Sequence, residues 1–221
     1  MLWVASVYLP RFISLYRKNK TNFIKGIFML RWIHWWRDGW RHKRHHSWPL
    51  PEELHLIHAV IAHAEAHQRH WIDSLFGVKP AAIPEPTEAV INVIELLQHQ
   101  RVLLFEALFC VCVDHPQSVY RVMSSGALQW CRRLAMGLKP GLWTPPLSPD
   151  PDITGIILLR SWVGEPVWSR MRFSLPKEKV EEVERQPVIP VTAHKLSMLW
   201  MAVIAWIQRE RPRENGHVNG A

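Results

Sequence analysis

Histidines are concentrated in the first third of the chain, and three of them have the spacing of a metal site. Nine of the 13 His residues lie between His34 and His70. His63, His67 and His70 are separated by four and three residues, which places them on one side of a helix. Neutral imidazoles in this arrangement are ligands for Zn²⁺ or a similar cation. The alternatives are a solvated histidine-rich helix face, which we favour, and a surface that gains charge near pH 6.5.

The sequence lacks the short motifs that organise common enzyme sites. It has no phosphate-binding loop, no dinucleotide-binding glycine pattern and no nucleophile elbow. Paired acids such as Glu178 and Glu181 have the spacing of a solvated helix face rather than that of an acid and base pair. We therefore expect a protein without enzymatic activity, without a resident metal and without a cofactor.

The net positive charge of the chain comes from its N-terminal segment, where basic residues alternate with tryptophan. Residues 1–46 hold ten Lys and Arg residues against one acid, Asp38, whereas residues 47–221 have a net charge of −1. Each Lys or Arg adds roughly 1 kcal/mol to binding of an anionic membrane surface, and indole rings prefer the headgroup level of a bilayer. The residues that we expect to bind a membrane are Trp3, Arg11, Arg17, Lys18, Lys25, Phe28, Arg31, Trp32, Trp35, Trp36 and Trp40.

The N-terminal segment is better suited to lie on a membrane than to cross it. A spanning helix needs about 20 apolar residues. The apolar run 1–9 ends at Pro10, and the run 23–36 contains Lys25 and Arg31, which would cost about 5 to 7 kcal/mol at the centre of a bilayer. No cleavable secretory signal pattern is evident. We expect a peripheral protein on the cytoplasmic side of the inner membrane.

Three alternatives remain open for the basic, aromatic segment. Its charges and rings also suit nucleic acid, where cations contact phosphates and aromatic rings stack on bases. A helical hairpin that packs its tryptophans against the rest of the domain would leave only the charges in water. The chain would act as a structural subunit of a larger membrane complex if its apolar C-terminal helix docks on a neighbouring helix.

Proline-rich stretches divide the chain into five regions. We expect a mainly α fold, with helices at 51–76, 87–113, 117–136 and 192–209. The segments 153–163 and 167–175 are rich enough in β-branched residues to predict one short β-hairpin, with helix as the alternative for 156–162. The expected regions are a membrane-associating segment at 1–48, a helical domain at 51–138, a Pro-rich loop at 139–151, the hairpin and C-terminal apolar helix at 152–210, and a disordered tail at 211–221.

The layout of the chain resembles that of the entry-exclusion proteins of I-type conjugative plasmids. The resemblance rests on the basic, Trp-rich N-terminal sequence MLWVASVYLPRFISLYRKNK and FIKGIFMLRWIHWW and on the length of the chain. It implies a peripheral inner-membrane protein of the recipient cell that blocks redundant transfer through contact with a membrane protein of the conjugative transfer apparatus. Aromatic residues around Trp143, Trp162 and Trp168 are candidate contacts for that partner, or else core anchors.

Overall fold

The computed structural model describes residues 26–52, 66–113 and 123–210, and all regular structure in these residues is helical. The mainly α fold class is therefore confirmed. The residues of the sequence predictions that lie outside the described part are Trp3, Arg11, Arg17, Lys18, Lys25, His63 and the tail at 211–221.

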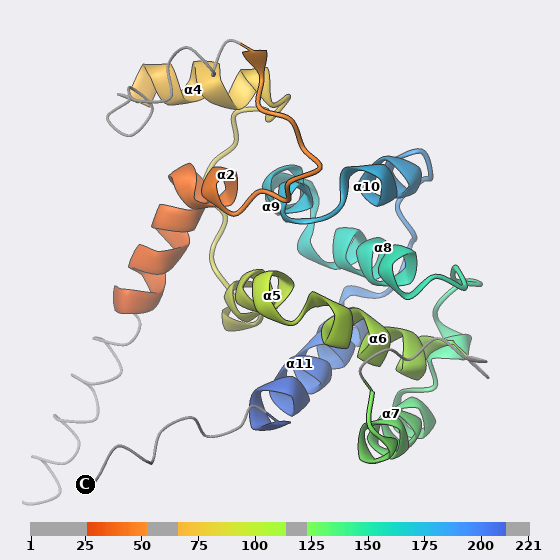
Figure 1. Cartoon of the computed structure of the whole chain (residues 1–221). Helices are drawn as coiled ribbons and strands as arrows, with labels where there is room; N and C mark the ends of the chain where they lie inside the picture. The colour runs from red at the N-terminus through yellow and green to blue at the C-terminus, as the bar shows by residue number, and fades with distance from the viewer. Residues whose placement is uncertain (1–25, 53–65, 114–122, 211–221) are drawn as a thin grey trace, which may run out of the picture.

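The helix α6 (Arg101–Cys112) lies at the centre of the fold (Figure 1). Its sequence is apolar on almost every side, and residues 104–111 are all buried, because α7, α8, α5 and α11 pack around it. The other helices and turns are the helical residues 26–34, η1 (Trp35–Gly39), α2 (Trp40–His42), α4 (Ala66–Leu75), α5 (Glu88–His99), α7 (Ser125–Leu138), η3 (Pro140–Leu142), α8 (Pro151–Val163), α9 (Glu165–Met171), η4 (Arg172–Ser174), α10 (Lys177–Glu184) and α11 (Ala193–Glu210).

Side-chain caps define where several of these helices begin. The hydroxyl of Thr87 accepts the backbone N–H of Val90 at 3.3 Å, which confirms Thr87 as the start of a helix. The expected single helix at 87–113 is wrong in one respect, because Gln100 leaves helical geometry (φ −139°, ψ 28°) and separates α5 from α6. The two helices therefore change direction at Gln100 and create a junction that the periodicity of the sequence does not reveal.

The expected β-hairpin at 153–163 and 167–175 is wrong, and helix, the alternative for 156–162, is observed. Asp150 accepts the N–H groups of Asp152 and Ile153 at 2.8 and 3.3 Å, so it caps α8. Gly164 has a positive φ of 74° and separates α8 from α9 instead of forming a hairpin turn. The apolar character of α8 reflects burial against α6 and α10 rather than strand pairing.

One hydrophobic core joins the two halves of the chain. Buried residues of this core extend from Trp32 to Ile207, and α6 packs closely against α8 across the proline-rich segment 139–151. That segment therefore connects elements of a shared core. The N-terminal helical residues 26–42, including the π-helical turn η1, pack on one side of this core and leave their outer face in solvent (Figure 1).

Candidate anion-binding surface

Four tryptophans that were expected to bind a membrane are buried in the core. The exposed fractions of Trp32, Trp35, Trp36 and Trp40 lie between 0% and 5%. The indole of Trp32 stacks on that of Trp35 with ring centroids 5.2 Å apart and donates to the carbonyl of Pro84 at 2.9 Å. The membrane prediction is corrected for these four side chains, because the surrounding helices remove them from any surface.

A buried ionic cluster fixes this tryptophan-rich helix to the rest of the fold. Asp73 of α4 forms ion pairs with Arg41 of α2 and with Arg170 of α9, the latter at 3.5 Å. Asp38 completes the cluster with an Nη1–Oδ1 distance of 3.0 Å to Arg41. The guanidinium of Arg170 lies 4.0 Å from the ring centroid of Trp36, which adds a cation–π contact. Arg41 and Arg170 therefore have a structural role.

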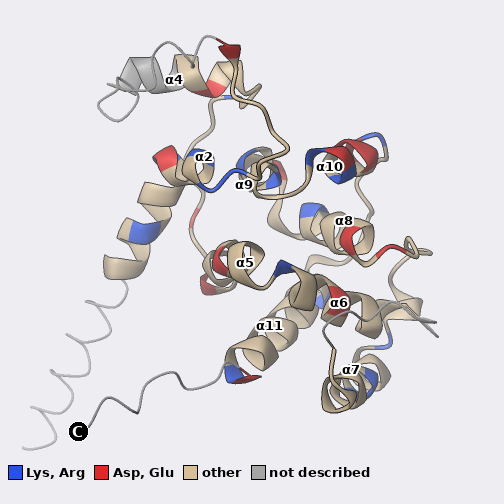
Figure 2. Ribbon diagram, viewed as in Figure 1, with Lys and Arg blue, Asp and Glu red and all other residues tan. Residues whose placement is uncertain are grey.

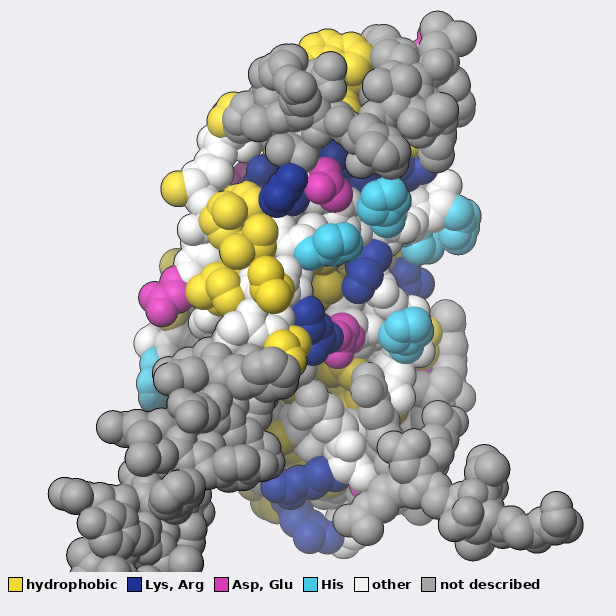
Figure 3. Space-filling model, turned by 90° about the vertical axis from the view of Figure 1, so that its left-hand side faces the viewer, with side chains coloured by type: hydrophobic (Ala, Val, Ile, Leu, Met, Phe, Trp, Pro, Cys, Tyr) yellow, Lys and Arg dark blue, Asp and Glu magenta, His cyan; other side chains and the backbone are white. Residues whose placement is uncertain are grey.

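The outer face of the N-terminal helix carries exposed apolar side chains. Ile27, Met29 and Leu30 are exposed to 45%, 43% and 68%, whereas Phe28 is half-buried against the core. Arg31 is exposed and forms an ion pair with Glu95 of α5. Figure 3 shows hydrophobic side chains next to histidine, lysine and arginine side chains on this side of the molecule.

A cavity of about 790 Å³ opens between the segment that follows the first helix and the α5–α6 junction. Figure 2 shows basic residues directly after α2 and at the start of α6, and both segments line the cavity. Its lining contains no Asp or Glu among the described residues. The charged and imidazole side chains that line it are His42, Lys43, Arg44, His45, His46, His99 and Arg101.

Backbone and side-chain hydrogen bonds hold the first of these segments in place. The N–H of His45 donates to the carbonyl of Phe173 at 2.7 Å, and the indole N–H of Trp48 donates to the carbonyl of Leu175 at 2.8 Å. The Nε of Arg44 donates to the carbonyl of Trp48 at 2.9 Å. The cavity wall formed by 42–48 is therefore anchored on η4 and the residue after it.

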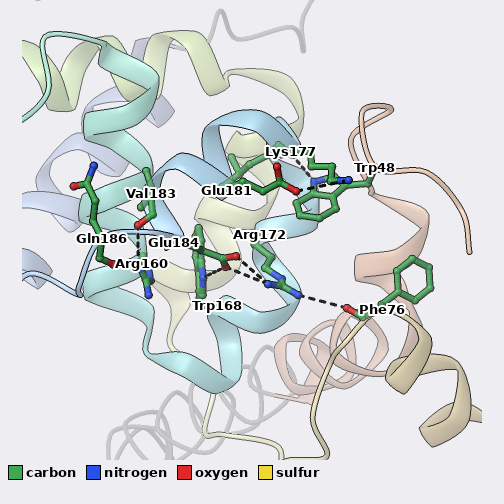
Figure 4. A network of polar contacts seen from close by, with 11 residues as sticks. Trp48, Phe76, Arg160, Trp168, Arg172, Lys177, Glu181, Val183, Glu184 and Gln186 are labelled. Atoms are coloured by element: carbon green, nitrogen blue, oxygen red, sulfur yellow. Dashed lines mark hydrogen bonds and ion pairs between the residues drawn. The ribbon is translucent and has the colours of Figure 1, made fainter.

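A polar network fixes η4 in turn (Figure 4). Arg172 forms an ion pair with Glu184 of α10 at 3.1 Å, and the same carboxylate accepts the indole N–H of Trp168 at 2.8 Å. Arg172 also donates to the carbonyl of Phe76 at 3.4 Å. The network joins η4 to α9, to α10 and to the residue that follows α4, and the segment 42–48 is hydrogen-bonded to η4.

Burial has the largest effect on the pKa values of the basic side chains that line the cavity, and repulsion between like charges adds to it for Lys43 and His45. Burial, followed by repulsion from Arg31, lowers the pKa of the Lys43 ammonium, and burial lowers the pKa of the Arg44 guanidinium. Burial is also the main reason why the pKa of His45 is lowered. An anion in the cavity would reverse these shifts, because it stabilises each protonated form.

The other sequence candidates have structural positions in the described part of the chain. The indole N–H of Trp143 donates to the carbonyl of Leu138 at 2.9 Å, and Trp162 stacks on Trp200 with centroids 5.1 Å apart. Trp168 is buried, with an exposed fraction of 1%. Trp168 is therefore a buried anchor of the fold, whereas Trp143 and Trp162 are half-buried and their role as partner contacts stays a prediction.

Of the histidines expected as metal candidates, His63 lies outside the described residues. His67 and His70 lie on α4. The described residues contain no group of three or more His, Cys, Asp or Glu side chains placed to hold a metal ion. No helix in the described ranges has the length and hydropathy needed to cross a bilayer.

Most residues of the cavity were missed by sequence reasoning. The run His42 to His46 is visible as a dense basic segment, but His99 and Arg101 face it only because the chain bends at Gln100. Comparisons of the chain with protein-family models, with curated proteins and with solved structures found no match.

Proposed function

We propose that the protein is a non-enzymatic protein that attaches peripherally to an anionic membrane surface through the outer face of residues 26–34. The observation that carries the proposal is the exposure of Leu30 to 68%, with Ile27 and Met29 beside it, in the segment where the chain concentrates its positive charge. Exposed apolar residues flanked by cations are typical of interfacial helices.

The exposed apolar side chains of residues 26–34 and the positive charge of the N-terminal segment both favour binding to an anionic membrane. Transfer of a fully exposed large aliphatic side chain out of water stabilises by about 1.5 to 3 kcal/mol, and each cation near an anionic surface adds about 1 kcal/mol. Residues 1–46 carry a net charge of +9, so attraction to anionic headgroups complements the apolar contact. The tryptophans support this attachment indirectly, because their burial directs Ile27 and Leu30 outward.

Vesicle sedimentation tests the proposal. The full chain is mixed with vesicles of equal parts phosphatidylglycerol and phosphatidylcholine, or of phosphatidylcholine alone. We expect binding to the anionic vesicles, and Leu30→Glu should weaken it by about tenfold because the variant loses an apolar contact and adds repulsion. Leu142→Glu is the matched control, since Leu142 is exposed to 82% in a different element, η3.

The outcomes separate a membrane from other partners. Equal loss of binding in Leu30→Glu and Leu142→Glu would show that net charge alone governs attachment, against the proposal. Tight binding of an oligonucleotide together with absent vesicle binding would assign the basic segment to nucleic acid, which is the alternative from the sequence.

We extend the proposal to the role implied by the resemblance to entry-exclusion proteins, in which a membrane protein of a conjugative transfer apparatus is the partner. The layout of the chain supports this extension. Mating frequency into recipients that produce the chain tests it directly. We expect redundant transfer to fall, and Leu30→Glu to restore it at equal protein level. Unchanged transfer in recipients with the intact protein at the membrane would contradict the extension and leave the membrane proposal standing.

A further inference from the structure

The cavity between residues 42–46 and the α5–α6 junction has the size of a ligand site. Its volume of about 790 Å³ lies within the range of roughly 300 to 1,000 Å³ that is usual for small-molecule pockets. Two chain segments, separated by more than 50 residues, form opposite walls. A third element contributes Ser174 of η4, so the cavity belongs to the tertiary structure and not to one flexible loop.

The cations of the cavity have no acidic partners among the described residues. Lys43, Arg44 and Arg101 line it and take part in none of the ion pairs that the described carboxylates form. Glu95 is paired with Arg31, and Glu178 of α10 opposes the lowering of the His45 pKa. Three full positive charges therefore share one water-filled space, an arrangement that is stabilised by a bound anion.

Backbone groups add directional donors at the same place. The first intrahelical bond of α6 joins the N–H of Leu104 to the carbonyl of Gln100 at 2.9 Å, and no side chain caps the N–H groups of residues 101–103. Because α5 ends where α6 begins, their end charges of about half a unit each largely cancel. The attraction for an anion therefore comes from the side chains that line the cavity.

A relay of hydrogen bonds fixes the tautomer of His45. The N–H of Lys177 donates to Ser47 Oγ at 2.9 Å, and Ser47 Oγ lies 2.8 Å from His45 Nδ1, which also accepts the N–H of Ser47 at 3.3 Å. Nδ1 is thus an acceptor, and in the neutral ring Nε2 carries the proton. His45 lines the cavity as a hydrogen-bond donor whether or not it is charged.

We propose that this cavity binds a phosphate group with at least two negative charges, such as a phosphomonoester or pyrophosphate, held by Lys43, Arg44 and Arg101. A second cavity of about 350 Å³ adjoins the first through Lys43, and its lining includes Leu30 and the ion pair of Arg31 with Glu95. The phosphate therefore belongs either to a free anion or to the headgroup of a lipid whose chains lie along Leu30. The inference about the cavity does not depend on the proposed attachment to a membrane.

Calorimetric titration of the full chain with inorganic pyrophosphate tests the site. We expect saturable binding, and Lys43→Gln and Arg101→Gln should each weaken it by about tenfold, the loss of one charge-assisted hydrogen bond. Arg132→Gln on α7 is the control, because it removes the same charge from an exposed helix position that does not line the cavity. Circular dichroism of each variant establishes that the fold is retained.

A second arm identifies the source of the phosphate. Vesicles of phosphatidylcholine containing phosphatidate are compared with vesicles containing enough phosphatidylglycerol to give equal surface charge. Preference for phosphatidate that is lost in Lys43→Gln assigns the site to a lipid headgroup. Pyrophosphate binding without that preference assigns it to a free anion, and both results support the site.

Three outcomes would overturn the inference. The first is that pyrophosphate does not bind and phosphatidate is not preferred. The second is that Arg132→Gln weakens binding as much as Lys43→Gln, which indicates diffuse attraction. The third is that a single-stranded oligonucleotide binds more tightly than pyrophosphate through the same residues, which assigns the cavity to nucleic acid. Ile27→Glu separates the two proposals, because Ile27 is exposed to 45% and lines neither cavity. The variant should weaken vesicle binding and leave pyrophosphate binding unchanged.

Discussion

Two groups of basic residues that are neighbours in the sequence have opposite surroundings in the fold. Arg41 is buried, with an exposed fraction of 9%, and forms ion pairs with Asp38 and Asp73. Lys43, two residues later, lines an open cavity with Arg101 and no carboxylate. The charge of the first group is neutralised by carboxylates and shielded from solvent, whereas the charge of the second group has no carboxylate partner and is accessible to solvent.

The difference shows that the role of a cation is decided by its acidic partners and not by local sequence. A buried guanidinium without a counterion would destabilise the fold, so Asp73 is required where Arg41 and Arg170 meet. An accessible cation has no such requirement, because water or a ligand solvates it. Substitutions in the first group should therefore lower the free energy of unfolding, whereas substitutions in the second group should change it little.

The largest effect is expected from removal of the shared acid of the buried cluster. Asp73→Ala leaves Arg41 and Arg170 buried without their shared carboxylate. It should lower the free energy of unfolding by about 3 to 5 kcal/mol. Denaturant unfolding measures the change. The control is Glu181→Ala, which breaks a half-exposed pair with Lys177 and should cost about 0.5 kcal/mol or less. Similar values for both variants would refute the structural role of the buried cluster.

The second effect concerns the ring that faces the buried guanidinium. Trp36→Leu removes the ring that lies 4.0 Å from Arg170 and leaves a partly filled space in the core, so we expect a loss of about 2 to 4 kcal/mol. Trp71→Leu is the matched control, because Trp71 is exposed to 44% on α4 and should change stability by about 0.5 kcal/mol at most. If the two substitutions are equally mild, Trp36 does not anchor the helix.

The third prediction concerns the unbalanced group. Lys43→Gln should leave the free energy of unfolding within about 0.5 kcal/mol of the original value, and any change should be towards greater stability, since repulsion from Arg31 is relieved. Unfolding at low and high salt checks the cause, because salt screens the same repulsion. A marked loss of stability would place Lys43 with the structural cations and contradict the contrast.

The smallest effect is a dependence of stability on pH through His45. Its pKa is lowered below 6.5 by burial first, then by His46 and Arg101, with Glu178 opposing them. The unfolded ring therefore takes up its proton at a higher pH than the folded ring, and stability should fall as the pH drops through and below about 6.5. His45→Gln should flatten a plot of Tm against pH over this range. A slope that is unchanged in the variant would assign it to other groups.

Several features of the fold were predictable because they depend on residues close together in the chain. Thr87 starts a helix because its hydroxyl meets an N–H three residues later. The apolar C-terminal helix predicted at 192–209 is observed as α11. Local composition also predicted that no helix at 23–36 is apolar enough to span a bilayer, in agreement with the described residues from 26 onward.

Other features were decided by contacts between distant residues. The segment 153–163 is as apolar as a buried strand, and only its position between α6 and α10 makes it a buried helix. The tryptophans at 32–40 suit a membrane by composition, but the helices around them bury them. The cavity was not predictable, since it forms where the bend at Gln100 brings Arg101 opposite Lys43.

The amino-acid sequence by itself therefore determined a helical protein with its positive charge at one end, because helix propensity, capping and charge are local properties. Only the tertiary structure decided which of the basic and aromatic residues are available to a partner. The physical reason is that burial and ion pairing depend on residues far apart in the chain. Asp73 forms an ion pair with the buried Arg41, whereas no described carboxylate forms an ion pair with Lys43.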